Sequence, residues 1–199
     1  MPRFRAIIFD LLTALLDSWT LWGDIAGDKE LGAQWRRRSL ELIYASGEYR
    51  PYREIVAEAA DPEFADELLR RWDELEPWPE APAVLRDLAT DHRLALVTNT
   101  SEDLARRAAA KLGVEVDLLV SAERVGFYKP RPEPYRAGMG AGRPALFVAG
   151  SPGDVPGAEA VGLPVVWHNR VGAPAAGGTP MAVIEMLDPL PGLVRGTAH

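Results

Sequence analysis

Several polar side chains stand where apolar, strand-like runs of the sequence end. Asp10 ends one run, Thr98 and Asn99 end a second, and Asp154 follows a third after a short Gly/Pro loop. Lys129 lies between these segments in the tripeptide Tyr-Lys-Pro. A single Asp at a strand end usually does no more than end the strand, so the argument depends on the combination. A lysine beside Asp10 would keep the carboxylate ionised, as a nucleophile requires, which makes Asp10, Lys129 and Asp154 candidate catalytic residues.

The runs that end at these residues alternate with helical segments. Strands are expected at residues 6–9, 94–97, 116–120, 145–149, 163–167 and 181–186, with helices at 104–112 and 155–161 among them. Such alternation predicts an α/β fold whose parallel sheet is built from right-handed crossovers. In such sheets the site lies beyond the carboxyl ends of the strands, where the candidate residues fall.

The segment 14–79 differs from the rest, because it contains no strand-like run. Helical stretches are expected at residues 19–25, 31–44, 52–59 and 62–75, with apolar side chains at helical spacing. Three prolines, Pro77, Pro79 and Pro82, mark the return to the sheet. We therefore predict a core made of residues 1–13 and 80–199 and a small helical cap, residues 14–79, inserted over the site.

Composition excludes several classes of function. The chain has 199 residues, 22 Lys and Arg against 29 Asp and Glu, a net charge of −7, and no cysteine. This balance argues against a nucleic-acid partner, and the missing thiols exclude disulfides and cysteine nucleophiles. The first apolar run is too short to cross a membrane and has no cleavage site, so we expect a cytoplasmic protein with no membrane association. No histidine belongs to a cluster with metal-ligand spacing, and we expect no metal and no cofactor.

Four segments together resemble the motifs of the haloacid dehalogenase superfamily. They are residues 9–17 (Phe-Asp-Leu-Leu-Thr-Ala-Leu-Leu-Asp), 96–99 (Leu-Val-Thr-Asn), 128–130 (Tyr-Lys-Pro) and 147–154 (Phe-Val-Ala-Gly-Ser-Pro-Gly-Asp). Each segment is weak evidence alone, but their order and spacing agree over nearly the whole chain. The resemblance implies a Rossmann-like core with a helical cap, and a nucleophilic Asp10 that forms an ester which water then hydrolyses.

Within the superfamily, the sequence is most similar to the L-2-haloacid dehalogenases. The run Trp-Arg-Arg-Arg-Ser-Leu-Glu at 35–41 resembles their helix with the halide-binding arginine, which corresponds to Arg36. Arg37 and Arg38 point elsewhere on the helix, so we expect them at the surface. The resemblance implies that Arg36 and Asn99 hold the leaving halide and that Thr98 binds the substrate carboxylate. It also implies that Asp154 orients or activates water and that Tyr135, six residues after Lys129, belongs to the site.

The sequence departs from the superfamily at several positions. Leu12 and Gly150 stand where phosphatases have an acid–base Asp and a Mg²⁺-binding Asp, so Mg²⁺-dependent phosphoryl transfer is not expected. The usual Gly-Thr after the first motif is Thr13-Ala14, which predicts that the threonine hydroxyl near the nucleophile is lost. Ser151, which we place among the substrate-binding residues, replaces an asparagine, and Gly153 replaces an aromatic residue.

These observations predict metal-independent hydrolysis at a carbon centre, most simply of a small anionic 2-substituted organic acid. A divergent phosphatase with weakened Mg²⁺ binding and a non-catalytic relative remain alternatives. A serine esterase with Ser151 as nucleophile is disfavoured, because the chain is short for that fold and Asp154, which stands between Ser151 and His168, is too close to the serine. The family dehalogenases are often dimers, which suggests a homodimer.

Overall fold

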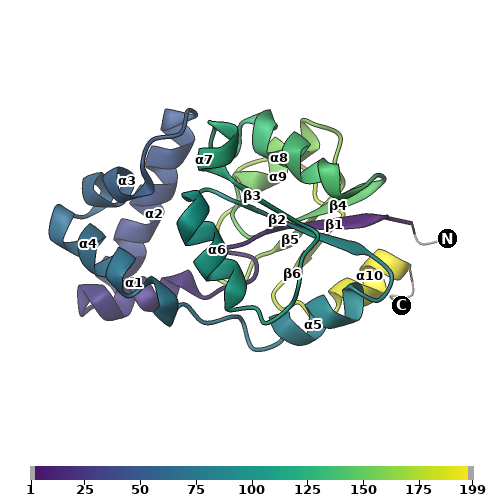
Figure 1. The fold of residues 1–199 in the computed structure, drawn as a ribbon, viewed down its shortest axis with the longest axis horizontal. Helices are drawn as coiled ribbons and strands as arrows, with labels where there is room; N and C mark the ends of the chain where they lie inside the picture. The colour runs from purple at the N-terminus through teal and green to yellow at the C-terminus, as the bar shows by residue number, and fades with distance from the viewer. Residues whose placement is uncertain (1–2, 197–199) are drawn as a thin grey trace.

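The computed structural model describes residues 3–196, which form a six-stranded parallel sheet with helices on both faces (Figure 1). The strands are β1 (Ala6–Asp10), β2 (Arg93–Thr98), β3 (Leu118–Ser121), β4 (Ala145–Ala149), β5 (Val165–His168) and β6 (Ala182–Ile184). Their spatial order is β3-β2-β1-β4-β5-β6, and every pairing is parallel. The predicted α/β, Rossmann-like fold class is confirmed.

The strands are buried on both faces, which explains their continuous apolar runs. Along β1, Ile7 and Phe9 belong to one apolar cluster, whereas Ala6 and Ile8 belong to the other, since alternate side chains of a strand point to opposite faces. One face is covered by α5 (Ala81–Leu88), α6 (Glu102–Ala110) and α10 (Leu190–Arg195). The other is covered by α8 (Pro132–Gly138), η2 (Met139–Ala141) and α9 (Asp154–Glu159), with the short α7 (Ala122–Val125) after β3.

Four helices between β1 and α5 gather at one end of the sheet (Figure 1). They are α1 (Ser18–Ala26), α2 (Lys29–Ser46), α3 (Tyr52–Ala59) and α4 (Pro62–Arg70), followed by η1 (Trp72–Glu74). We call them the cap helices. Phe64 holds them together, because the centre of its ring lies 5.0 Å from that of Trp22 and 4.9 Å from that of Trp35. The segments that lead into and out of the cap helices run side by side, and Leu16 and Pro77 form an antiparallel bridge between them. The boundaries at 13/14 and 79/80 stay predictions.

Side-chain caps explain where elements differ from expectation. The helix expected at 31–44 begins earlier, at Lys29, because an Asp28 carboxylate oxygen accepts the backbone N–H groups of Glu30 and Leu31 at 2.8 and 2.9 Å. The strand expected at 116–120 begins only at Leu118. Before it, the Asp117 side chain accepts the N–H of Leu94 at 2.9 Å and so replaces a backbone partner in the ladder.

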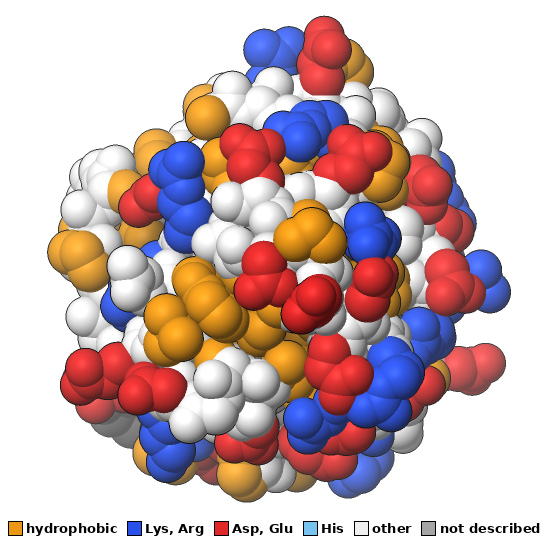
Figure 2. Space-filling model, turned by 90° about the vertical axis from the view of Figure 1, so that its left-hand side faces the viewer, with side chains coloured by type: hydrophobic (Ala, Val, Ile, Leu, Met, Phe, Trp, Pro, Cys, Tyr) orange, Lys and Arg blue, Asp and Glu red, His pale blue; other side chains and the backbone are white. Residues whose placement is uncertain are grey.

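The surface over the cap helices carries both signs of charge (Figure 2). Several Arg side chains there are paired with acids, such as Arg53 with Asp66 at 2.6 Å and Arg71 with Glu74 at 2.6 Å. Such pairs leave little concentrated positive potential on this face. Among the helices in residues 3–196, none combines the length and the apolar character needed to cross a bilayer.

Candidate active site

The carboxyl ends of β1 and β2 bring the first site residues together. Asp10 is the last residue of β1 and pairs in register with Val97, so Thr98 and Asn99 follow directly beside it. Asp154 begins α9, which follows the loop after β4, the other neighbour of β1. Lys129 reaches the same place from the loop before α8. The topology therefore brings Asp10 together with Lys129 and Asp154, which lie more than a hundred residues later in the sequence.

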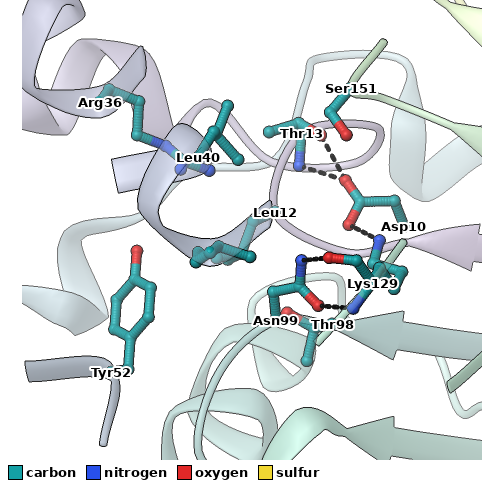
Figure 3. Close-up of a pocket in the computed structure, with 11 residues that line it drawn as sticks. Asp10, Leu12, Thr13, Arg36, Leu40, Tyr52, Thr98, Asn99, Lys129 and Ser151 are labelled. Carbon is teal, nitrogen blue, oxygen red and sulfur yellow. Dashed lines mark hydrogen bonds and ion pairs between the residues drawn. The ribbon is translucent and has the colours of Figure 1, made fainter. Parts of the chain in front are cut away.

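Lys129 lies between two carboxylates. Its Nζ is 2.6 Å from Asp10 Oδ1 and 2.9 Å from Asp154 Oδ2, and the Tyr135 hydroxyl donates to Asp154 Oδ1 at 2.9 Å. All four side chains are buried, and Lys129 is only 1% exposed. Asp10 and Lys129 border the cavity shown in Figure 3, whereas Asp154 and Tyr135 are not among the residues that line it. Tyr135 thus contacts Asp154 and does not line the cavity.

The charges of this cluster set the protonation states. Burial by itself would raise the pKa of Asp10, but the Lys129 charge and hydrogen bonds from Lys129 and Thr13 outweigh it and hold this pKa below its ordinary value. Burial and the nearby Asp10 charge raise the pKa of Asp154, against the opposing effect of Lys129. Burial would lower the pKa of Lys129, but the two carboxylates raise it. Asp10 is therefore the more acidic carboxyl group of the pair.

The expectation that no threonine hydroxyl remains beside Asp10 is wrong. The Thr13 hydroxyl donates to Asp10 Oδ2, as do the backbone N–H groups of Thr13 at 2.8 Å and Ala14 at 3.2 Å. The turn after β1 folds back so that residue 13, rather than residue 14, presents its side chain to the carboxylate. The hydroxyl has moved by one position, and Asp10 Oδ2 accepts three hydrogen bonds from this turn.

The same turn explains Gly150. A Cβ at this position would lie 2.2 Å from the backbone nitrogen of Ala14 and 2.3 Å from the carbonyl carbon of Thr13. Backbone atoms this close leave no room for any side chain at position 150. The turn that holds Asp10 is therefore incompatible with a carboxylate at that position. Among residues 3–196, no three His, Cys, Asp or Glu side chains are placed to hold a metal ion together.

Arg36 enters the site from α2 in the cap helices. It is 2% exposed, whereas Arg37 and Arg38 are exposed, as expected. Its Nε donates to Ser18 Oγ and one terminal nitrogen donates to Ser39 Oγ, both at 3.3 Å. The ring centres of Trp19 and Trp22 each lie 5.7 Å from its guanidinium carbon. Within residues 3–196, Arg36 forms no salt bridge, and a buried cation without an acid is costly.

Asn99 and Thr98 complete the floor of the cavity. The Asn99 amide accepts the N–H of Lys129 at 2.8 Å and donates to the carbonyl of Lys129 at 3.2 Å, so it fixes the lysine backbone. Its second N–H group stays available to a ligand. The Thr98 hydroxyl lies 3.4 Å from that of Thr100. Both residues line the cavity together with Asp10 (Figure 3).

Tyr44 occupies the space left by Gly153. A Cβ at Gly153 would lie 2.7 Å from the Tyr44 ring, and the Tyr44 hydroxyl donates to Ser151 Oγ at 2.8 Å. The aromatic group missing at position 153 is thus supplied from α2. Tyr44 also borders an outer groove of about 510 Å³, which shares Leu40 and Ser151 with the inner cavity.

The inner cavity separates Asp10 from Arg36. Its lining comes from both parts of the molecule and consists of Asp10, Leu12, Thr13, Arg36, Leu40, Ile43, Tyr52, Thr98, Asn99, Lys129 and Ser151. Its volume of about 20 Å³ is enough for one water molecule, so a substrate must displace the side chains of its walls. A buried carboxylate and a buried cation thus line one cavity, together with the apolar side chains of Leu12, Leu40 and Ile43.

A family model described as haloacid dehalogenase-like hydrolase matches residues 4–162. The chain belongs to the haloacid dehalogenase-like hydrolases. The family resemblance and the expectation of a hydrolase are thereby confirmed.

Named relatives cover nearly the whole chain. The chain is 29% identical to haloacetate dehalogenase H-2 of Moraxella sp. (strain B), over 98% of this chain and 99% of that protein. It is also 29% identical to (S)-2-haloacid dehalogenase 1 of Pseudomonas sp. (strain CBS-3), over 87% and 88% of the two chains. A solved L-2-haloacid dehalogenase from Xanthobacter autotrophicus, with chloropropionic acid covalently bound, matches with a TM-score of 0.83 at 22% identity, over 98% of this chain and 99% of that chain. At that identity the likeness shows the fold.

In this haloacid dehalogenase-like hydrolase, the sequence interpretation missed three residues of the site. Tyr44 has a detectable signal, because positions 36, 40 and 44 share one helix face with Arg36. Thr13 has a weaker one, because an Asp that ends a strand often accepts the N–H of the residue three positions later. Tyr52 has none, since only the packing of α3 against α2 brings it to the cavity.

Proposed function

We propose that this hydrolase removes the halogen from small 2-halocarboxylic acids by metal-independent displacement, with an ester on Asp10 as intermediate. The observation that carries the proposal is that an ionised Asp10 and a buried Arg36, which has no acid partner among residues 3–196, line one cavity. An Asp nucleophile at one end and an anion site at the other are what in-line displacement of a halide at carbon requires. The names of the relatives, which are haloacetate and 2-haloacid dehalogenases, agree with this class.

In the first step, Asp10 attacks C2 of the substrate and the carbon–halogen bond breaks. We assign the attack to Oδ1, because Oδ2 already accepts three hydrogen bonds, whereas Oδ1 accepts one, from Lys129. The bond pair leaves with the halogen, and the charge that develops there is stabilised by Arg36 and by the free N–H of Asn99. The products of this step are the Asp10 ester and a halide ion.

In the second step, water attacks Cγ of the Asp10 ester. Negative charge then develops on Oδ2, where the N–H groups of Thr13 and Ala14 and the Thr13 hydroxyl already point, so they serve as an oxyanion hole. We assign both proton transfers of this step to Asp154. It accepts a proton from the attacking water and then donates this proton to the departing 2-alkoxide. The overall reaction yields a 2-hydroxy acid, a halide ion and a proton, and Asp10 is restored with one oxygen from water.

The substrate carboxylate needs donors of its own. We assign it to Thr98 and Ser151, which border the cavity on the sheet side, next to Asp10. The Ser151 hydroxyl accepts from Tyr44 and keeps its own proton to donate. Tyr135 then acts as a positioning residue through Asp154.

The phosphatase alternative loses support at two positions. Leu12 offers no proton to a leaving alcohol, and the backbone packed against Gly150 excludes a carboxylate for Mg²⁺. The non-catalytic alternative does not explain why Arg36 is buried with no salt bridge to any acid in the described part of the chain. A cytoplasmic location and a homodimer stay predictions, and size-exclusion chromatography tests the second.

The deciding experiment compares L-2-chloropropionate with an aryl phosphate, each with Mg²⁺ and with EDTA. Chloride release that EDTA does not affect is expected, without phosphate release. Single turnover in ¹⁸O-water should place the label in Asp10 rather than in the first molecule of product. Mg²⁺-dependent phosphate release, or label only in the product, would overturn the proposal, and Asp10→Asn is the control.

A further inference from the structure

Tyr52 is a buried polar residue for which the two proposed steps have no use. It is the first residue of α3, is 2% exposed, and lines the inner cavity together with Arg36. Its hydroxyl is buried without a hydrogen-bond partner among residues 3–196. In Figure 3 the ring extends from the cap side and its hydroxyl points towards the side of the cavity that holds Arg36.

The packing of the Tyr52 ring does not explain its hydroxyl. The ring meets Trp72 edge to face, with 5.7 Å between the ring centres, and a phenylalanine would make the same contact. A buried hydroxyl without a partner costs stability, because it has lost its bonds to water. Such a group at the wall of a cavity is explained if a ligand accepts its hydrogen bond.

The surroundings define what that ligand is. Burial keeps the pKa of Tyr52 above its ordinary value, although the Arg36 charge works in the opposite direction, so the hydroxyl stays protonated and is a donor. Arg36 beside it is a second donor and carries a positive charge. The apolar side chains that line the same cavity, those of Leu12, Leu40 and Ile43, offer no acceptor. Two converging donors, one of them cationic, in an apolar wall suit a small anion.

We propose that Tyr52 is a further catalytic residue that donates a hydrogen bond to the departing halide beside Arg36. The inference builds on the proposed dehalogenation and defines its leaving-group end. Negative charge grows on the halogen as its bond to C2 breaks, so a donor aimed there binds the transition state more strongly than the substrate. Hydrogen bonds to halides strengthen from iodide to fluoride. The site is therefore adapted to the poorer leaving groups, chloride and above all fluoride.

The test is Tyr52→Phe, assayed on the 2-iodo, 2-bromo, 2-chloro and 2-fluoro acids of one carbon skeleton. The measured quantity is kcat/KM, because it reports the step in which the halide leaves even where ester hydrolysis limits kcat. We expect a loss of about ten- to a hundredfold for the chloro acid. The loss should be smaller for the bromo and iodo acids and larger for any fluoro acid that the wild type converts.

Stability separates this role from a structural one. Because the hydroxyl has no partner within the described residues, Tyr52→Phe should unfold at the same temperature as the wild type or a higher one while it loses activity. The matched control is Tyr49→Phe, which also removes a cap hydroxyl, but from a half-buried ring that packs on Tyr128 outside the cavity. This control should leave kcat/KM unchanged for every halogen.

An equal loss for all halogens, or no loss, would overturn the role of Tyr52. If the wild type releases no halide from any of these acids, the proposed function fails, and binding of free halide then tests Tyr52 separately. Added sodium bromide should raise the unfolding temperature of the wild type more than that of Tyr52→Phe, measured against sodium sulfate at equal ionic strength. Equal shifts in the two proteins would overturn the inference by this route as well.

Discussion

Buried polar groups on the two sides of the cavity differ in how many of their hydrogen bonds and ion pairs the protein itself provides. On the sheet side, Lys129 contacts both Asp10 and Asp154, and the Asp10 Oδ2 oxygen accepts three further hydrogen bonds. On the cap side, Arg36 has only two serine hydroxyls and two indole rings, and the Tyr52 hydroxyl has no partner within the described residues.

This difference separates the charges that the fold itself satisfies from those that need a ligand. The Lys129 cluster is complete before a substrate arrives, so it contributes to stability and holds the nucleophile ready. Arg36 is only partly compensated, because a cation over an aromatic ring contributes about 0.5–2 kcal/mol, less than the cost of a buried charge. An anion bound between the two sides supplies the negative charge that Arg36 lacks and an acceptor for the Tyr52 hydroxyl.

The largest effect is expected when the nucleophile is removed. Asp10→Asn keeps the size of the side chain and abolishes its negative charge, so kcat should fall by about 10³-fold or more. Halide release measures the loss, and circular dichroism checks the fold. Activity within about tenfold of the wild type would contradict the assignment of Asp10 as the nucleophile.

Paired substitutions on the two sides test the comparison directly. Lys129→Met leaves two carboxylates buried together and should lower the free energy of unfolding by about 3–5 kcal/mol. Arg36→Met removes a buried cation that has no acid partner among residues 3–196, so stability should stay unchanged or rise while kcat/KM falls by about 10²-fold. Urea unfolding at pH 7 and halide release measure the two quantities. Equal destabilisation by both variants would contradict the contrast between the two sides.

Removal of the Thr13 hydroxyl should lower activity by a smaller factor. Thr13→Val keeps the shape of the side chain and both backbone donors but removes the hydroxyl from Asp10 Oδ2. One hydrogen bond to a charged group is worth about 1.5–3 kcal/mol, so activity should fall by about ten- to a hundredfold. Thr13→Ser keeps the hydroxyl and serves as the matched control. A loss that is the same in both variants would show that the hydroxyl is not involved.

The smallest expected effect is a shift in the acid limit of activity. Because the pKa of Asp10 is held below its ordinary value of 3.8, kcat/KM should fall only at a pH below that value. The same depression stabilises the fold above the unfolded pKa, and this contribution disappears as the pH falls through the folded value. Initial rates from pH 7 downwards measure the limit. An acid limb centred about two pH units above the ordinary value would show that Asp10 is not held ionised.

Sequence patterns were sufficient for the parts of the molecule that depend on local order. The apolar runs that end at Asp10, Thr98 and Asp154 are strands and loops of the sheet, and their common edge follows from parallel topology. The family resemblance pointed to Arg36 as the inward arginine, and helical geometry then directs its two neighbours elsewhere, as the structure shows. The local cap at Asp28 and the Asp117 side-chain bond to the neighbouring strand, which moved two element ends, were not anticipated.

Strand periodicity and the order of the motifs were enough to predict the fold class and the pairing of Asp10 with Lys129, because this information lies in local patterns. How the departures from the family are compensated could be seen only in the folded chain. The turn after β1 presents the Thr13 hydroxyl to Asp10 although the next position is an alanine, and Tyr44 crosses from α2 to fill the space over Gly153. Tyr52 reaches the cavity because α3 packs against α2. These are contacts between surfaces far apart in the chain, and no local pattern specifies which atoms will meet.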